Sequence, residues 1–161
     1  FLGGGMQTAL FGAGCFWGVE LTFSQMPGVV ETAVGYSGGA TANPTYDDVC
    51  SGTSGHTEVV RVTFDPDTVS YQELVAKFFV LHDPTQLNRQ GPDIGQQYRS
   101  VIFTADAGQD EVARAVRTQL AAENRFARPI VTAIEPVRTF WPAEEYHQHY
   151  LAKQGRGACR V

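Results

Sequence analysis

The sequence has few cysteines, few positive charges and no long hydrophobic run, and each shortage excludes a class of protein. The three cysteines, Cys15, Cys50 and Cys159, form no CxxC pair and no zinc spacing, which argues against a disulfide scaffold or a structural metal. Twelve Lys and Arg stand against 17 Asp and Glu, a net charge of -5, which argues against nucleic acid or an anionic membrane as main partner. No apolar run approaches a membrane span. Together these features predict a protein of the reducing cytoplasm that uses a thiol.

Length and composition are those of an ordinary globular domain, with 161 residues, 43% hydrophobic and 18% charged. Such a chain can bury the core of a single domain, predicted to span 1–161, and the composition excludes disorder. Residues 1–5 lack the basic start and apolar stretch of a signal peptide and are interpreted as preceding a native start at Met6. The glycines of 154–161 predict a flexible tail in which Cys159 can swing.

The most informative stretch is 12–18, Gly-Ala-Gly-Cys-Phe-Trp-Gly, which follows a short apolar run at 8–11. It predicts a strand, a tight turn and a helix over 16–23, with Cys15 at the helix N-terminus. The helix dipole and unpaired N–H groups there favour the thiolate, which is the nucleophile. A buried cysteine in an aromatic core is the plainer interpretation. A phosphate loop is disfavoured, because Trp17 stands where a dinucleotide fingerprint needs its third glycine.

The clearest strand pattern covers 57–64 and places Glu58 on the face that carries Val60, Val62 and Phe64. Burial there disfavours ionisation of the carboxyl, and a carboxyl that is neutral near neutral pH is a proton donor. In the alternative, Glu58 lies at the end of the strand, reaches water and forms a salt bridge. The pattern leaves both possibilities open.

The remaining pattern predicts strands and helices that alternate around two long polar loops. Strands are expected at 29–36, 100–104 and 130–137. Helices are expected at 71–81, 107–120 and 142–153. The first of these helices follows a capping box that begins at Ser70. The loops at 37–56 and 84–97 are long for a compact domain, and such loops are usually functional or disordered. This order predicts an α/β (α+β two-layer) domain with helices on a small mixed sheet.

Several motifs, in order along nearly the whole chain, resemble those of one family. They are Gly14-Cys15-Phe16-Trp17-Gly18, Gly35-Tyr36-Ser37-Gly38-Gly39, Asn43-Pro44-Thr45-Tyr46, Gly55-His56-Thr57-Glu58, His82-Asp83-Pro84, Arg89-Gln90-Gly91, Asp93, Gln97-Tyr98-Arg99-Ser100 and Glu145-Tyr146-His147-Gln148. Together they resemble the peptide methionine sulfoxide reductases of the A type. The resemblance implies a ferredoxin-like α/β plait with additional strands, helices and long loops. It also implies an oxidoreductase that reduces methionine S-sulfoxide, free or in proteins, to methionine.

The resemblance further implies the roles of the residues that carry the chemistry. Cys15 attacks the sulfoxide sulfur and becomes a sulfenic acid, while Glu58 protonates the oxygen. Tyr46 and Tyr98 support that oxygen with hydrogen bonds. Cys159 then attacks the sulfenic acid to form a disulfide, which thioredoxin reduces. This order of reaction steps agrees with the chemistry of the groups. A sulfoxide oxygen leaves poorly unless it is protonated, and a sulfenic acid condenses with a nearby thiol.

By the same resemblance, Phe16 and Trp17 hold the methyl group of the substrate, and Asp93 and His147 support the site. Cys50 matches no catalytic position, and a structural thiol is its expected role, although it would replace Cys159 if that residue were too far from Cys15. No metal, flavin or nicotinamide is required, and thioredoxin or another dithiol is the external reductant. The expected protein is a monomer that repairs oxidised proteins under oxidative stress.

Two other classes of function compete with this one. A cysteine hydrolase would use Cys15 with His147 or His82 as base. A non-enzymatic module would bind methionine-rich partners through the aromatic pocket. A metal site from His147 and His149 is disfavoured, because residues two apart on a helix point to different faces.

Overall fold

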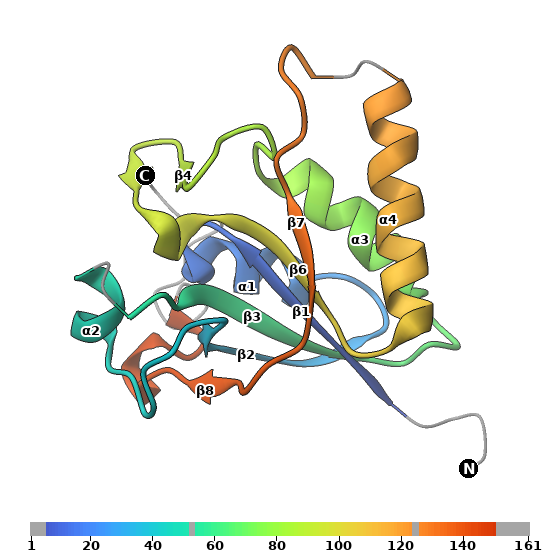
Figure 1. The fold of residues 1–161 in the computed structure, drawn as a ribbon. Helices are drawn as coiled ribbons and strands as arrows, with labels where there is room; N and C mark the ends of the chain where they lie inside the picture. Colours follow the sequence, from blue (N-terminus) through green and yellow to red (C-terminus); the bar gives the residue numbers. More distant parts are fainter. Residues whose placement is uncertain (1–5, 52–53, 124–125, 151–161) are drawn as a thin grey trace.

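The computed structural model describes residues 6–51, 54–123 and 126–150. Its centre is a six-stranded sheet in the order β7-β6-β1-β3-β2-β8 (Figure 1). The strands are β1 (Gln7–Ala13), β2 (Val29–Ser37), β3 (Thr57–Phe64), β6 (Ser100–Thr104), β7 (Ala133–Pro136) and β8 (Trp141–Pro142). Neighbouring strands are antiparallel except for β6 and β7, which are parallel, so the sheet is mixed.

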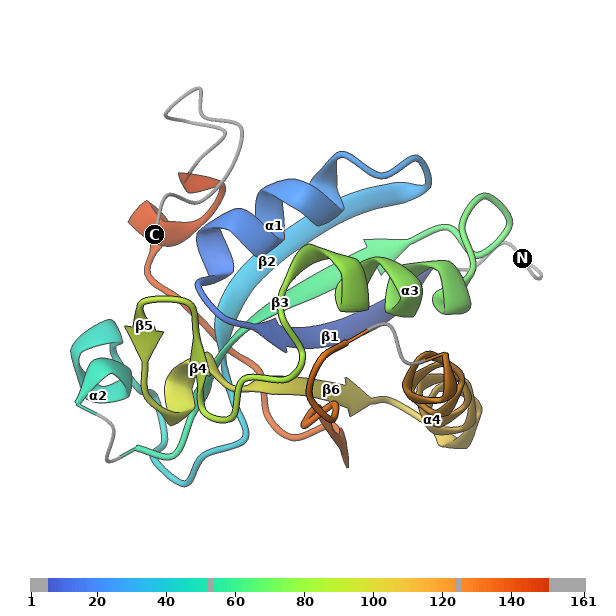
Figure 2. The same ribbon diagram turned by 90° about the horizontal axis from the view of Figure 1, so that it is seen from above.

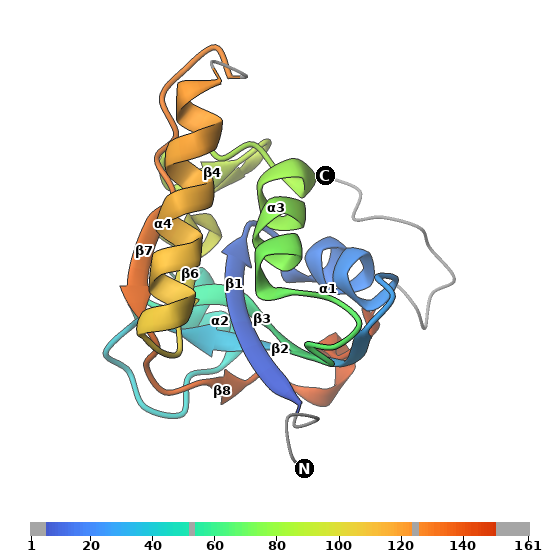
Figure 3. The ribbon, with the colours of Figure 1, turned by 90° about the vertical axis from the view of Figure 1, so that its right-hand side faces the viewer.

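Three long helices cover one face of this sheet. They are α1 (Phe16–Ser24), α3 (Tyr71–Leu81) and α4 (Ala107–Ala122). Figures 2 and 3 show α4, α3 and α1 side by side, with α1 over β2 and β3 and α4 over β6 and β7. Phe11 of β1 marks the centre of this layer, because its ring stacks on Phe23 of α1 and on Phe78 of α3 at centroid distances of 5.0 and 5.3 Å. Burial of each such ring contributes about 1.5–3 kcal/mol.

The opposite face of the sheet carries a smaller cluster, formed by Leu10, Val59, Val101 and Phe103. Phe140, from the segment between β7 and β8, packs against it. The fold is therefore a mixed α/β arrangement with helices on one side of the sheet, as the sequence predicts. The ferredoxin-like description stays a prediction.

The elements predicted from the clearest local sequence patterns are confirmed by the structure. The strands predicted at 57–64 and 100–104 are β3 and β6 with the same bounds. The capping box before α3 is confirmed, because Glu73 N donates to Ser70 Oγ and Ser70 N donates to Glu73 Oε1, both over 3.0 Å. The donor and acceptor of each hydrogen bond are only three residues apart, so the local sequence is enough to predict this helix start.

The two predicted loops contain structure that the sequence reading did not assign. The first holds a short helix, α2 (Tyr46–Cys50), which begins with a capping box between Thr45 and Asp48. The second folds into a two-stranded hairpin of β4 (Arg89–Gln90) and β5 (Asp93–Ile94), followed by the short helix η2 (Gln96–Tyr98). These elements are too short to produce a hydrophobic period.

The helix predicted to begin at Pro142 is wrong. Pro142 lies in β8 and is paired with Gly35 at the edge of the sheet, where proline is tolerated because it has no N–H to donate. The short helix η3 (Glu145–His147) follows instead. The strand expected at 130–137 is shorter, since β7 begins at Ala133. The predictions for residues 1–5 and for the tail at 154–161 lie outside the described residues.

Candidate active site

The turn between β1 and α1 places Cys15 at the N-cap of the helix, half-buried. Gly14 makes this turn with φ of 94°, a left-handed conformation that glycine adopts without strain. A Cβ atom on Gly14 would also come within 2.8 Å of the Gln90 side chain. The predicted position of Cys15, at a strand-to-helix turn, is therefore confirmed.

Glu58 is buried directly beside this turn, with 2% of its surface exposed. Its Oε1 accepts a hydrogen bond of 3.2 Å from the backbone N–H of Phe16, the first residue of α1 and the neighbour of Cys15. The N–H groups at a helix start have no partner within the helix, so this carboxyl supplies one from another element. The alternative in which Glu58 reaches water is wrong.

Tyr46 enters the site from the first residue of α2. Its hydroxyl donates to the Cys50 thiol, and the pKa of Tyr46 is raised above its usual 10.0 by burial, by this hydrogen bond and by the charge of Glu58. The Cys50 side chain is exposed. Burial raises the pKa of Cys50 while the hydrogen bond from Tyr46 lowers it, with a net rise.

Tyr98 approaches the same space from the end of η2. Its pKa is raised by burial and by the negative charges of Glu58, Cys50, Asp93 and Cys15. A raised pKa keeps both phenols protonated at neutral pH, so each can donate a hydrogen bond. Glu58 is thus near both tyrosines, and Cys15 is near Tyr98 as well.

Asp93, also named by the sequence, lies in β5 and is half-buried, and burial raises its pKa. This shift favours the protonated acid somewhat more than in water.

An aromatic cluster forms the other wall of the site. Trp17 Nε1 donates to His147 Nδ1 over 3.1 Å, which places the proton of a neutral His147 ring on Nε2. Burial lowers the pKa of His147 and so favours this neutral form. The ring of Tyr46 lies 4.5 Å and that of Phe16 lies 5.2 Å from His147. Phe16 is 1% exposed, whereas Trp17 is half-buried.

Glu144 is a site residue that the sequence reading missed. Its Oε1 accepts from the Tyr36 hydroxyl over 2.9 Å and its Oε2 from the backbone N–H of Tyr46 over 3.0 Å. Burial works against ionisation, but these hydrogen bonds hold the pKa of Glu144 below its usual 4.5. One carboxylate thus ties β2 to the first turn of α2. No local signal marks it, because both partners lie about a hundred positions away.

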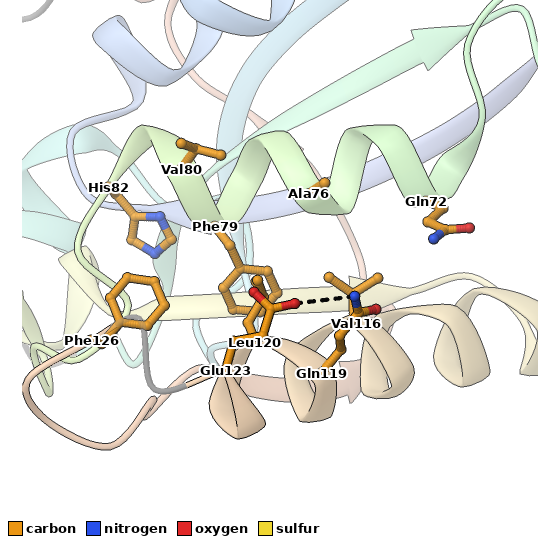
Figure 4. Close-up of a pocket in the computed structure, with 10 residues that line it drawn as sticks. All are labelled: Gln72, Ala76, Phe79, Val80, His82, Val116, Gln119, Leu120, Glu123 and Phe126. Carbon is orange, nitrogen blue, oxygen red and sulfur yellow. Dashed lines mark hydrogen bonds between the residues drawn. The ribbon is translucent and has the colours of Figure 1, made fainter.

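The two histidines considered as bases of a hydrolase differ in their contacts: among the described residues, both ring nitrogens of His82 have partners, but only Nδ1 of His147 has one. His147 Nδ1 accepts from Trp17. His82, at the end of α3, makes contacts of 2.7 Å from Nδ1 to the Phe78 carbonyl and 2.8 Å from Nε2 to Ser100 Oγ. It lines a cavity of about 430 Å³ between α3 and α4, which none of the candidate catalytic residues lines (Figure 4). This arrangement does not favour the hydrolase.

Two further expectations concern metals and membranes. Within residues 6–51, 54–123 and 126–150, no group of three or more His, Cys, Asp or Glu side chains is placed to hold a metal ion. Among the same residues, no helix is both long and apolar enough to cross a bilayer. Cys159 lies outside the part of the chain that the structure describes.

The site as described is that of a thiol-dependent enzyme: a half-buried thiol at a helix start, beside a buried carboxyl and two protonated phenols. Residues 7–161 match the family model of peptide methionine sulfoxide reductase. The peptide methionine sulfoxide reductase MsrA of Methanoculleus marisnigri is 61% identical over 156 residues, which cover 97% of this chain and 95% of the relative. The chain therefore belongs to the peptide methionine sulfoxide reductase family, as its motifs indicate.

Solved structures agree with this assignment. The methionine sulfoxide reductase A of Corynebacterium diphtheriae has a TM-score of 0.84 at 43% identity, and the match covers 96% of this chain and 78% of that one. Mxr1 of Saccharomyces cerevisiae in reduced form has a TM-score of 0.87 at 33% identity, covering 96% and 88%. Mxr1 has also been solved in complex with Trx2.

Proposed function

We propose that this protein reduces the S-sulfoxide of methionine, free or in proteins, to methionine, with Cys15 as nucleophile and Glu58 as acid. The observation that carries the proposal is the buried Glu58 carboxyl, hydrogen-bonded to the residue that follows Cys15. A nucleophilic thiol alone is common to many enzymes. A thiol paired with a buried acid suits a substrate whose oxygen must be protonated.

In the first step, the Cys15 sulfur attacks the sulfoxide sulfur and Glu58 gives a proton to the sulfoxide oxygen. A bond forms between the two sulfurs, and the protonated oxygen then moves from the substrate sulfur to the Cys15 sulfur as the sulfur–sulfur bond breaks and its electron pair stays on methionine. The products are methionine, reduced by two electrons, and a sulfenic acid on Cys15. Glu58 then regains a proton from solvent. Oxygen is transferred in this step and no outside oxidant is needed.

The surroundings of the two groups support the same step. Tyr46 and Tyr98 stay protonated because their pKa values are raised, and each can donate to the oxygen as negative charge develops on it. Trp17 and Phe16 offer an apolar wall for the methyl group. We assign Asp93 and His147 to the support of this pocket.

The second half of the cycle restores the thiol. The Cys159 thiol attacks the Cys15 sulfenic acid, a disulfide forms, and the oxygen leaves as water with one proton from each group. A dithiol reductant of the thioredoxin type then reduces the disulfide by thiol exchange. The complex of the yeast relative Mxr1 with Trx2 supports this partner. We further propose a single-domain, monomeric enzyme of the cytoplasm without a bound metal or organic cofactor.

The test is an anaerobic single turnover of prereduced enzyme on the two separated epimers of a methionine sulfoxide peptide, without added reductant. Methionine formed and thiols lost are followed in wild type, Cys159→Ser and Glu58→Gln. The proposal predicts methionine from the S epimer alone, loss of two thiols in wild type, and a trappable sulfenic acid in Cys159→Ser. No methionine from either epimer would reject it. A Cys159→Ser variant that still loses two thiols would assign the resolving role to Cys50.

A further inference from the structure

Glu144 joins α2 to the central sheet, and the reaction steps above do not use it. Its Oε2 accepts from the backbone N–H of Tyr46 over 3.0 Å, and its Oε1 accepts from the Tyr36 hydroxyl over 2.9 Å. Burial works against ionisation, but these hydrogen bonds hold the pKa of Glu144 below its usual 4.5, so it is a carboxylate at neutral pH. Donors reach both oxygens, which suits a carboxylate better than an amide with its single acceptor oxygen.

The piece of chain that carries Glu144 is fixed to β2 on both sides of this residue. Ala143 N donates to Val34 O over 3.0 Å. The Gln148 amide accepts from Val34 N over 2.9 Å and donates to Val34 O over 2.8 Å. Gln148 also donates to the Ala143 carbonyl over 3.0 Å, which closes this piece of chain on itself. Glu144 is therefore held between two attachments to a strand of the sheet.

Tyr36 gives the carboxylate a second fixed partner. Its side chain is fully buried, and it lies directly opposite Glu58 in the pairing of β2 with β3. Its ring lies 5.9 Å from that of Phe16. Because a carboxylate is planar, a hydroxyl that fixes Oε1 also fixes the place at which Oε2 accepts its hydrogen bond.

The helix that receives this hydrogen bond depends on such contacts. α2 has five residues and lies apart from the three long helices, and so short a helix is not stable by itself (Figures 1 and 2). Val49 attaches it to the hydrophobic core, and the ring of Tyr46 lies 4.5 Å from that of His147. The hydrogen bond to Glu144 acts on the backbone of Tyr46 itself, at the first residue of the helix.

The hydroxyl of Tyr46 has to change its partner during the reaction. It donates to the Cys50 thiol within α2, and a phenol has only one proton to donate. Donation to the sulfoxide oxygen therefore requires the side chain to turn. While Glu144 holds the backbone of Tyr46, this movement needs rotation of the side chain alone. A shift of the backbone would displace the far end of the side chain and weaken its contact with the oxygen.

We propose that Glu144 is a positioning residue for the first step: it holds the backbone of Tyr46 so that the phenol reaches the sulfoxide oxygen. This inference rests on the proposed function. Glu144 exchanges no proton with the substrate, and no bond is formed or broken on it. It acts through the Tyr46 hydroxyl, so its contribution to the rate requires that hydroxyl to be present.

The experiment is a double-mutant cycle of wild type, Glu144→Gln, Tyr46→Phe and the double variant, in anaerobic single turnover with saturating S-sulfoxide peptide. The rate of methionine formation is measured by rapid quenching and chromatography. Gln has nearly the shape of Glu, but its NH2 group faces one of the two donors, so we expect Glu144→Gln to slow methionine formation about ten-fold. In Tyr46→Phe, which has no hydroxyl to position, the same exchange should slow it less than about two-fold.

Asp47→Asn is the matched control. Asp47 is exposed and follows Tyr46 in α2, so this variant removes a nearby negative charge but keeps the hydrogen bond to Glu144, and its rate should be that of wild type. If Glu144→Gln does not fold, Tyr36→Phe replaces it in the cycle, because it removes the donor that fixes Oε1. Its smaller slowing should also disappear in the Tyr46→Phe background.

Two results would overturn the proposal. One is slowing of equal size with and without the Tyr46 hydroxyl, which is expected if Glu144 only stabilises the fold. The other is a wild-type rate in either single variant, Glu144→Gln or Tyr46→Phe. Absence of methionine from wild type would instead reject the proposed function.

Discussion

Glu58 and Glu20 are equally buried, each with 2% of its surface exposed; Glu20 lies on α1 and Glu58 accepts a hydrogen bond from the first residue of α1, but their surroundings differ. Glu20 receives donors on both of its oxygens, from Thr32 of β2 and from the backbone N–H of His149. Glu58 receives a backbone N–H and lies near three tyrosines, Tyr36, Tyr46 and Tyr98, whose pKa values are raised chiefly by burial and further by the charge of Glu58. Burial alone therefore does not assign a role; the partners do.

The largest expected effect comes from exchanging each carboxyl for an amide and comparing the rates of methionine formation in the two variants. Glu58→Gln keeps an oxygen for the Phe16 N–H but loses the acidic proton, so methionine formation should fall by about 10²–10⁴-fold. Glu20→Gln should leave that rate within a few-fold of wild type, because Glu20 supplies no proton to the substrate. Single-turnover methionine formation measures both. An equal loss of rate in the two variants would contradict the assignment of proton donation to Glu58 and not to Glu20.

His82 is a third buried titratable residue, and its hydrogen bonds do not offset the lowering of its pKa by burial. Burial lowers its pKa from the usual 6.5 to about 4, against the hydrogen bond to the Phe78 carbonyl. As pH falls from 6.5 towards 4, the unfolded chain takes up a proton that the folded protein resists. The free energy of unfolding should then decrease, by about 3 kcal/mol at most, and level off below pH 4.

Urea unfolding of wild type and His82→Gln over this pH range measures that effect. The variant lacks the titrating ring, so its curve should be flatter between pH 6.5 and 4. Parallel curves for the two proteins would show that other groups cause the acid destabilisation.

Removal of the Glu20 side chain tests how much this residue contributes to the stability of the fold. Glu20→Ala leaves the Thr32 hydroxyl and the His149 N–H without their acceptor, so the free energy of unfolding should fall by about 1–3 kcal/mol. Glu58→Gln should lose less, since its amide oxygen still accepts from Phe16. Urea unfolding at neutral pH compares them. A larger loss in Glu58→Gln than in Glu20→Ala would contradict this assignment.

The smallest expected effect concerns Tyr46 and the exposed thiol of Cys50. Tyr46→Phe removes a hydrogen bond that lowers the pKa of Cys50, so the pKa rises and the thiolate fraction at a given pH falls. Alkylation of Cys50 by iodoacetamide, followed at the peptide level by mass spectrometry, should slow about two- to ten-fold. Tyr98→Phe is the matched control and should leave the rate unchanged. Equal rates in wild type and Tyr46→Phe would show that the hydrogen bond does not affect the thiol.

The parts of the site that depend on local pattern could be predicted from the sequence. The position of Cys15 follows from an apolar run, glycines and a helix start. The two-residue period of β3 puts Glu58 on the apolar face but leaves open whether its carboxyl reaches water, which the structure decides. The capping box of α3 was also visible. The same signal, Thr45 followed by Asp48, precedes α2 and could have located that helix.

The parts that depend on distant partners could not be predicted in this way. Glu144 and Glu20 look like ordinary charged residues on the sequence, and their importance comes from hydrogen bonds to chain segments far away. The helix expected from Pro142 fails for a similar reason. Pairing of this segment with β2 outweighs the local preference, and residue periodicity contains no information about that pairing.

The Gln148 side chain has one more consequence, for the behaviour of the protein in concentrated solution. Its amide occupies the N–H and C=O of Val34 in the way a neighbouring strand would, next to the short pairing of β8 with Gly35 and Tyr36. An open strand edge recruits strands from other molecules and leads to aggregation. The glutamine, together with the Ala143 N–H that also donates to Val34 O, therefore closes the edge of β2 at this point against intermolecular association.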